Sequence, residues 1–71
     1  MTNINNDELK RILSELNSKG EENIHNASIM LIIDNDMAVY LELIARNFIE
    51  PLGKFSKLTQ HGKDTLKVLD V

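Results

Sequence analysis

The clearest alternation of apolar and polar positions lies in NNDELKRILSELNSK, residues 5–19. Apolar side chains recur there with the i, i+3, i+4, i+7 spacing of one helical face, at Leu9, Ile12, Leu13 and Leu16. Asn5 is a good N-cap, and Glu8 stands three residues later, as in a capping box. Gly20 supplies the stop. The pattern predicts an amphipathic helix from Asn5 to Lys19.

The next apolar segment, Ile29–Ile33, has no clear period, so it could be a buried strand or a buried helix. We favour a short helix that begins near Asn26, because asparagine caps helices well. Five consecutive apolar residues cannot all face one small core. Either two faces of this element are covered, or part of it meets a second subunit. The residues expected at such a homodimer interface are Ile29, Met30, Ile32 and Ile33.

A third helix is predicted from Asp34 or Asn35, as the cap, to about Arg46. Its expected inner face comprises Met37, Tyr40, Leu43 and Ile44. Asn47 is suited to the left-handed conformation that ends a helix.

Two short strands are expected next, around a turn that contains Pro51 and Gly53. The inward side chains of this hairpin are predicted to be Phe48, Phe55 and Leu58. A last helix is expected to begin at the N-cap Thr59.

Gly62 is unexpected in the first turn of that last helix, since glycine there costs up to about 1 kcal/mol relative to alanine. One interpretation is that the helix folds back so tightly that only a residue without a Cβ fits. The other is that a weak helix former is tolerated near a frayed end. We favour the first, because Leu58, Thr59 and Leu66 stand where the family pattern described next has its matching residues.

The stretch YLELIARNFIEPLGKFSKLTQHGKDTL, residues 40–66, resembles the C-terminal half of winged helix-turn-helix proteins of the MarR and PadR type. The resemblance rests on the ending LTxxGxxxL and places Gly62 at the glycine of the closing helix. Asn47 stands where the family usually has glycine. The implied fold is mainly α with a small β-hairpin (α+β): three helices, a two-stranded wing and a C-terminal helix.

Composition limits the fold and the location. The chain has 71 residues, which we interpret as a single domain over residues 1–71. It has no cysteine, and its longest apolar run is far shorter than the roughly 20 residues of a membrane helix. The first residues contain neither an apolar signal segment nor a glycine at position 2. We expect a cytoplasmic protein without a membrane partner.

Charge is unevenly distributed along the chain. The net charge is −3, with residues 1–45 carrying three basic and eight acidic side chains and residues 46–71 carrying five basic and three acidic ones. An anionic partner such as double-stranded DNA would therefore contact the C-terminal third. The candidate phosphate-binding residues are Arg46, Lys54, Lys57, Lys63 and Lys67.

The third helix is poorly suited to reading DNA, although the resemblance gives it that role. Its outward face is expected to carry Asn35, Ala38, Val39, Glu42 and Arg46. This set has one cation, and Asp34 and Asp36 at the helix start would repel phosphates.

Catalysis and cofactor binding are not indicated. His25 and His61 lack metal-ligand spacing, and the three glycines are isolated, so no nucleotide loop is present. We expect no enzyme activity, no metal, no cofactor and no small-molecule substrate.

Two functions remain. One, which we favour, is a dimeric DNA-binding transcriptional regulator or accessory factor, as the resemblance implies. The other is a winged-helix scaffold used for protein–protein interaction, through homo- or heterodimerisation without DNA binding, which the charge distribution favours.

Overall fold

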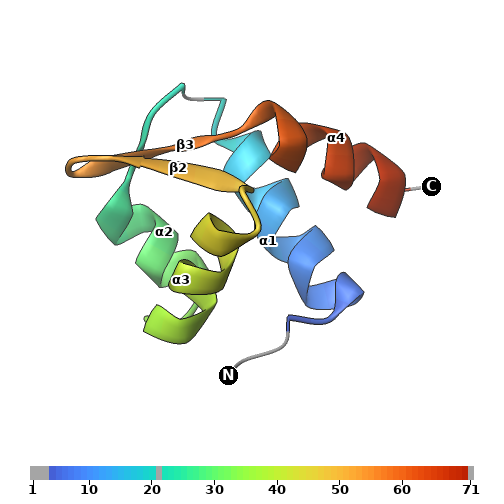
Figure 1. Cartoon of the computed structure of the whole chain (residues 1–71), viewed down its shortest axis with the longest axis horizontal. Coiled ribbons are helices and arrows are strands. Elements are labelled where there is room, and N and C mark those ends of the chain that lie inside the picture. Colours follow the sequence, from blue (N-terminus) through green and yellow to red (C-terminus); the bar gives the residue numbers. More distant parts are fainter. Residues whose placement is uncertain (1–3, 21, 71) are drawn as a thin grey trace.

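The computed structural model describes residues 4–20 and 22–70. These residues form four helices and one three-stranded antiparallel sheet, an α+β arrangement (Figure 1). The elements in chain order are α1 (Asn6–Ser18), β1 (Ile24–His25), α2 (Asn26–Ile32), α3 (Met37–Ala45), β2 (Ile49–Leu52), β3 (Phe55–Leu58) and α4 (Gln60–Leu69).

Helix α1 forms as predicted. The Asn5 side chain accepts a hydrogen bond from the Glu8 amide at 2.8 Å. All four predicted apolar residues are buried: Leu9, Ile12, Leu13 and Leu16. Helix α4 packs beside α1, and Lys10 pairs with Asp70 at 3.3 Å. The capping signals and the apolar period were therefore sufficient to predict this element.

The sheet has one more strand than the predicted two-stranded hairpin. Its order is β1-β3-β2, and β1 pairs with β3 through Ile24 opposite Ser56 and His25 opposite Phe55. The prediction missed β1 because two residues are too few to display an alternating pattern. The β2–β3 hairpin extends to the side of the molecule opposite the C-terminal end of α4 (Figure 1).

Helix α2 confirms the helical interpretation of the apolar run and buries two of the four residues predicted at a homodimer interface. Ile29 and Ile33 are buried in the core of this chain, and Met30 and Ile32 are half-buried against it. Ile29 and Ile33 therefore present no surface to a second subunit. Only Leu31 of the run is largely exposed.

Helix α3 begins later than predicted and presents a different face to the core. Asp36 is the N-cap, whereas Asp34 and Asn35 both adopt left-handed backbone conformations with φ of 57°. Val39, predicted to face outward, is buried, and Met37, predicted to face inward, is 55% exposed. The error arose because Glu42 is the only charged residue of α3, so apolar periodicity could not select one face.

The hairpin presents Ser56, not Phe55, to the core. Ser56 and Leu58 alternate inward on β3 and are buried, together with Phe48 before β2. Phe55 is 44% exposed, and its ring meets that of His25 edge-on at a centroid distance of 5.3 Å. The prediction for Phe55 was wrong because side chains alternate along a strand, and Phe55 lies three residues from the inward-facing Leu58.

Four further apolar residues complete the core of the described residues. The buried apolar cluster also includes Ile4, Ile24, Leu43 and Ile49. Within residues 4–20 and 22–70, no helix has the length and apolar character needed to cross a bilayer.

Candidate functional site

The solvent-facing side of α3 is apolar. Met37, Ala38, Leu41 and Ala45 are all exposed, with Leu41 57% exposed. They lie at i, i+1, i+4 and i+8, so they form one stripe along the helix. We call these four residues the α3 face. None of them carries a charge or a hydrogen-bond donor in its side chain.

Side chains on the buried side of α3 hold the α3 face in place. Leu43 is fully buried, and Val39 packs into the same core. Tyr40, on the same buried side, brings its hydroxyl to 3.3 Å from Ser56 Oγ on β3. Ser56 Oγ in turn donates to Asn26 Oδ1 at 2.6 Å. Helix α3 is thus tied to both the sheet and α2, which fixes the direction in which its outer face points.

Charged side chains of opposite sign flank the two ends of the α3 face. At the N-terminal end the Asp36 carboxylate accepts from the amides of Ala38 and Val39, at 3.0 and 3.4 Å. At the C-terminal end Arg46 lies 3.3 Å from Glu42 Oε2. The helix therefore begins with an acid and ends with a base. Each charge also suits the helix dipole at its own end.

The turn of the β2–β3 hairpin is anchored by Asn26. The Asn26 backbone amide donates to the Lys54 carbonyl at 2.9 Å, and its side chain donates to the Gly53 carbonyl at 3.0 Å. Lys54 is consequently exposed on a turn held at two points. The sequence suggested Asn26 only as a helix cap, because contacts between residues so far apart in the chain leave no local pattern.

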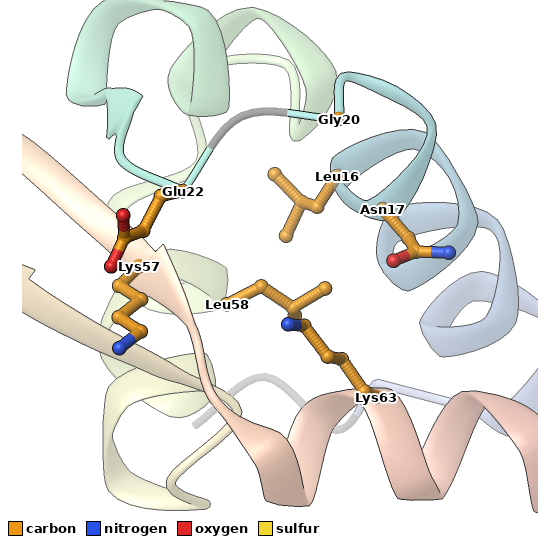
Figure 2. A pocket seen from close by; sticks show the side chains of 7 residues that line it. All are labelled: Leu16, Asn17, Gly20, Glu22, Lys57, Leu58 and Lys63. Atoms are coloured by element: carbon orange, nitrogen blue, oxygen red, sulfur yellow. The ribbon is translucent and has the colours of Figure 1, made fainter.

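The five candidate phosphate-binding cations do not gather in one site. Lys57 and Lys63 line one pocket of about 420 Å³ between α1, β3 and the start of α4 (Figure 2). Glu22 contributes an acid to that pocket. Arg46 pairs with Glu42 on α3, Lys54 lies in the hairpin turn, and Lys67 follows Lys63 by four residues on α4. The pocket lining comprises Leu16, Asn17, Gly20, Glu22, Lys57, Leu58 and Lys63.

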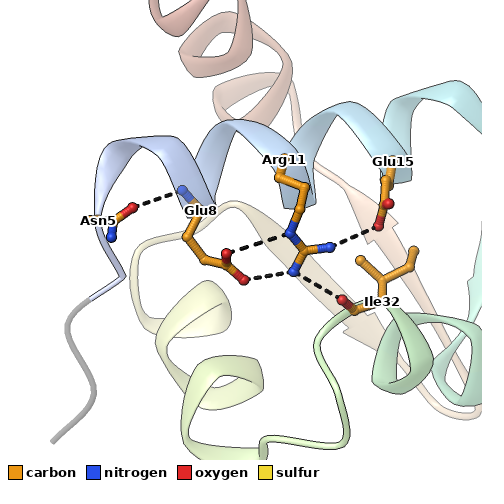
Figure 3. A network of polar contacts seen from close by, with 5 residues as sticks. All are labelled: Asn5, Glu8, Arg11, Glu15 and Ile32. Carbon is orange, nitrogen blue, oxygen red and sulfur yellow. Dashed lines mark hydrogen bonds and ion pairs between the residues drawn. The ribbon is translucent and has the colours of Figure 1, made fainter.

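A polar cluster around Arg11 connects α1 to the end of α2 (Figure 3). Arg11 donates to Glu8 at 2.6 Å, to Glu15 at 3.2 Å and to the Ile32 carbonyl at 3.1 Å. The hydrogen bond with Arg11 lowers the pKa of Glu8, and the same bond raises the pKa of Arg11. These groups are solvent-exposed, so the cluster orients α2 against α1 but contributes little stability.

The acidic and histidine side chains of the described residues form no cluster suited to a metal ion. In the part of the chain that the structure describes, His, Asp and Glu side chains do not gather in a group of three that could hold a metal ion. His61, one of the two histidines, stacks on Phe48 with ring centroids 5.2 Å apart.

Comparisons with known proteins identify no relative of this chain. No protein-family model matches the sequence, and searches of curated proteins and of solved structures give no significant match. The assignment of a function therefore rests on the residues and their geometry.

Proposed function

We propose that this chain is a winged-helix scaffold that binds protein through the α3 face and does not use α3 to read DNA. The fold assignment is supported by the order of the elements, by the hairpin between α3 and α4, and by the three-stranded antiparallel sheet. Gly62 supports it too. It lies against the Phe48 carbonyl, as the resemblance to the ending LTxxGxxxL implies.

The observation that carries the proposal is the apolar character of the α3 face. A helix that reads the major groove needs side chains that donate to, or accept from, base edges. Met37, Ala38, Leu41 and Ala45 offer none. An apolar stripe in contact with water instead favours burial against another protein surface. Acidic residues at the start of α3 further oppose the approach of phosphates.

DNA binding by the hairpin is a second candidate, and one observation favours it. Lys54 is exposed on a turn that Asn26 holds at two points, and Lys57 is three residues further along β3. Two cations on a rigid hairpin can contact phosphates without a reading helix. In that case the protein would bind DNA weakly and with little sequence preference.

A titration of ¹⁵N-labelled protein with duplex DNA at low salt distinguishes these two uses of the fold. We expect the amide signals of α3 to stay in place, because the side chains of the α3 face have no hydrogen-bonding group for a base edge and no positive charge for a phosphate. The proposal is wrong if DNA shifts the signals of Met37–Ala45 and if this effect weakens steeply with added salt.

The same titration tests the second candidate through the hairpin signals. If DNA shifts only the signals around Lys54 and Lys57, the double variant Lys54→Glu/Lys57→Glu should abolish that effect, because it reverses two charges. A matched control is Lys10→Glu/Lys19→Glu. It changes the net charge by the same amount as the hairpin variant, but at one residue of α1 and at the residue just after α1. If both double variants lose DNA binding to the same extent, the attraction comes from net charge alone and the hairpin is not a DNA-binding site.

A further inference from the structure

Helix α2 is capped by a histidine. His25 has an extended backbone, with φ of −61° and ψ of 134°, and its Nδ1 accepts a hydrogen bond from the Ala27 amide at 3.1 Å. Serine, threonine, aspartate and asparagine are the usual residues at this position. Histidine differs from them because its acceptor nitrogen takes up a proton between about pH 5 and 8. The cap of α2 is therefore open to titration near neutral pH.

The hydrogen bond to Ala27 defines the protonation state of the His25 ring. A neutral imidazole has one acceptor nitrogen and one N–H group, so the Nδ1 that accepts this bond is unprotonated and the ring proton lies on Nε2. A second proton would go to Nδ1. The ring would then have two donors and no acceptor, and two N–H groups would face each other. Protonated His25 cannot form this cap.

The residue that follows the cap holds the β2–β3 hairpin. The Asn26 amide donates to the Lys54 carbonyl at 2.9 Å, and the Asn26 side chain donates to the Gly53 carbonyl at 3.0 Å. The side-chain oxygen of Asn26 accepts from Ser56 Oγ at 2.6 Å. Asn26 is the first residue of α2, so its position depends on the first turn of that helix. A change in the cap at His25 therefore reaches the hairpin turn.

We propose that His25 is a pH-sensitive cap that controls how firmly the β2–β3 hairpin is held against α2. Neutral His25 closes the first turn of α2 and keeps Asn26 bonded to the hairpin turn. Protonated His25 opens that turn and loosens the hairpin. This conformational device lies outside the α3 face, and it does not depend on the protein-binding function proposed for that face.

Cations on the hairpin disfavour a charged His25. Phe55 lies opposite His25 on β3, and the two rings meet edge-on, so this neighbour is uncharged. Lys54 precedes Phe55 in the chain, and Lys57 lies two residues beyond it, on the same side of the strand. A protonated imidazole would add a third like charge to this region. The positive end of the α2 dipole opposes protonation too.

Acids near His25 offset these effects only weakly. Glu50 on β2 lies directly opposite Lys57 in the sheet register, not opposite His25. Glu21 and Glu22 precede His25 by four and three residues. They remain that close along the chain when it unfolds, so they attract a proton to His25 in both states. Helix α2 itself, NASIMLI, carries no charged side chain. The folded state therefore favours the neutral ring.

The stability of the fold should consequently fall as the pH falls. In the range where an unfolded histidine takes up its proton, the unfolded chain binds more protons at His25 than the folded chain does, so acid favours unfolding. The contribution of the cap is complete above this range and is lost below it. From the usual effect of losing an N-cap, we expect the unfolding equilibrium constant to rise about threefold to tenfold between about pH 7.5 and 5.5.

Urea unfolding of the native chain and two asparagine variants at these two pH values tests the proposal. Asparagine is a good N-cap that does not titrate, so His25→Asn should lose most of the pH dependence. His25→Ser should behave in the same way. The matched control is His61→Asn, which removes the other histidine of the chain, on α4, and should keep the pH dependence of the native chain.

Amide hydrogen exchange locates the effect in the structure. After correction for the intrinsic effect of pH, the Ala27 and Asn26 amides of the native chain should lose protection about threefold to tenfold on acidification. In His25→Asn these two amides should keep their protection, because the asparagine cap is unchanged in this range.

Three results would overturn the proposal. One is an equal pH dependence of stability in the native chain and in both His25 variants. Another is a pH dependence that disappears in His61→Asn, which would assign it to the other histidine. The third is unchanged protection of Ala27 and Asn26 in the native chain. None of these results bears on the α3 face, whose proposed function is tested by the DNA titration.

Discussion

Replacing Gly62 with alanine is expected to destabilise the fold by about 1–3 kcal/mol, the usual cost of forcing an extra group into a packed site. A Cβ at this position would lie 2.7 Å from the Phe48 carbonyl oxygen and 2.8 Å from Leu58 Cδ1. The leucine can turn away, but the carbonyl belongs to the backbone. It also accepts the Thr59 amide hydrogen bond at 3.0 Å, so it cannot move freely.

Urea unfolding of variants at two adjacent positions of α4 measures this effect against helix propensity. At exposed Lys63 the alanine variant should be more stable than the glycine variant by as much as about 1 kcal/mol. At Gly62 the order should reverse, with glycine more stable than alanine. If alanine is more stable than glycine at both positions, Gly62 is only a tolerated weak helix former.

The second large effect is expected at Leu43, whose replacement by alanine should cost about 2–5 kcal/mol because it leaves a cavity in the core. Leu43 is fully buried, whereas Leu41, two residues earlier on the same helix, is 57% exposed. Leu41→Ala should therefore change the free energy of unfolding of the monomer by no more than about 0.5 kcal/mol.

Unfolding of both leucine variants in denaturant, at concentrations low enough to keep the chain monomeric, checks the orientation of α3. A larger loss at Leu41 than at Leu43 would mean that the helix is rotated and that the α3 face lies in the core. The pair thus tests the geometric basis of the proposed function without reference to any partner.

Local signals in the sequence were sufficient for several elements. Asn5 and Glu8 mark the start of α1, and the left-handed conformation predicted for Asn47 is found, with φ of 62°. Thr59 caps α4 by accepting the Gly62 amide at 3.0 Å. Each of these features depends on residues within one turn of each other, so a pattern in the chain can reveal them.

Features that depend on distant contacts were not predictable. Strand β1 exists because Ile24 pairs with Ser56, and two residues carry no pattern of their own. Ser56 is polar and would be expected on the surface, yet its hydroxyl is satisfied by Asn26 and Tyr40 inside the fold. A buried polar group of this kind becomes recognisable only when its partners are known.

The candidate site was predicted in part. The sequence indicated that α3 carries too few cations to read DNA, and this expectation motivated the protein-binding alternative. It did not reveal the α3 face, because α3 is apolar on nearly every side and its exposed stripe resembles its buried one. Leu41 was therefore not singled out, and the predicted interface was placed on α2 instead.

The most direct test of the central claim is the titration of ¹⁵N-labelled native protein with duplex DNA at low salt, in which the amide signals report where the chain contacts DNA. If α3 is not a DNA-reading helix, the signals of Met37–Ala45 should stay in place at every DNA concentration. Shifts of the Met37–Ala45 signals that weaken steeply with added salt would contradict the account.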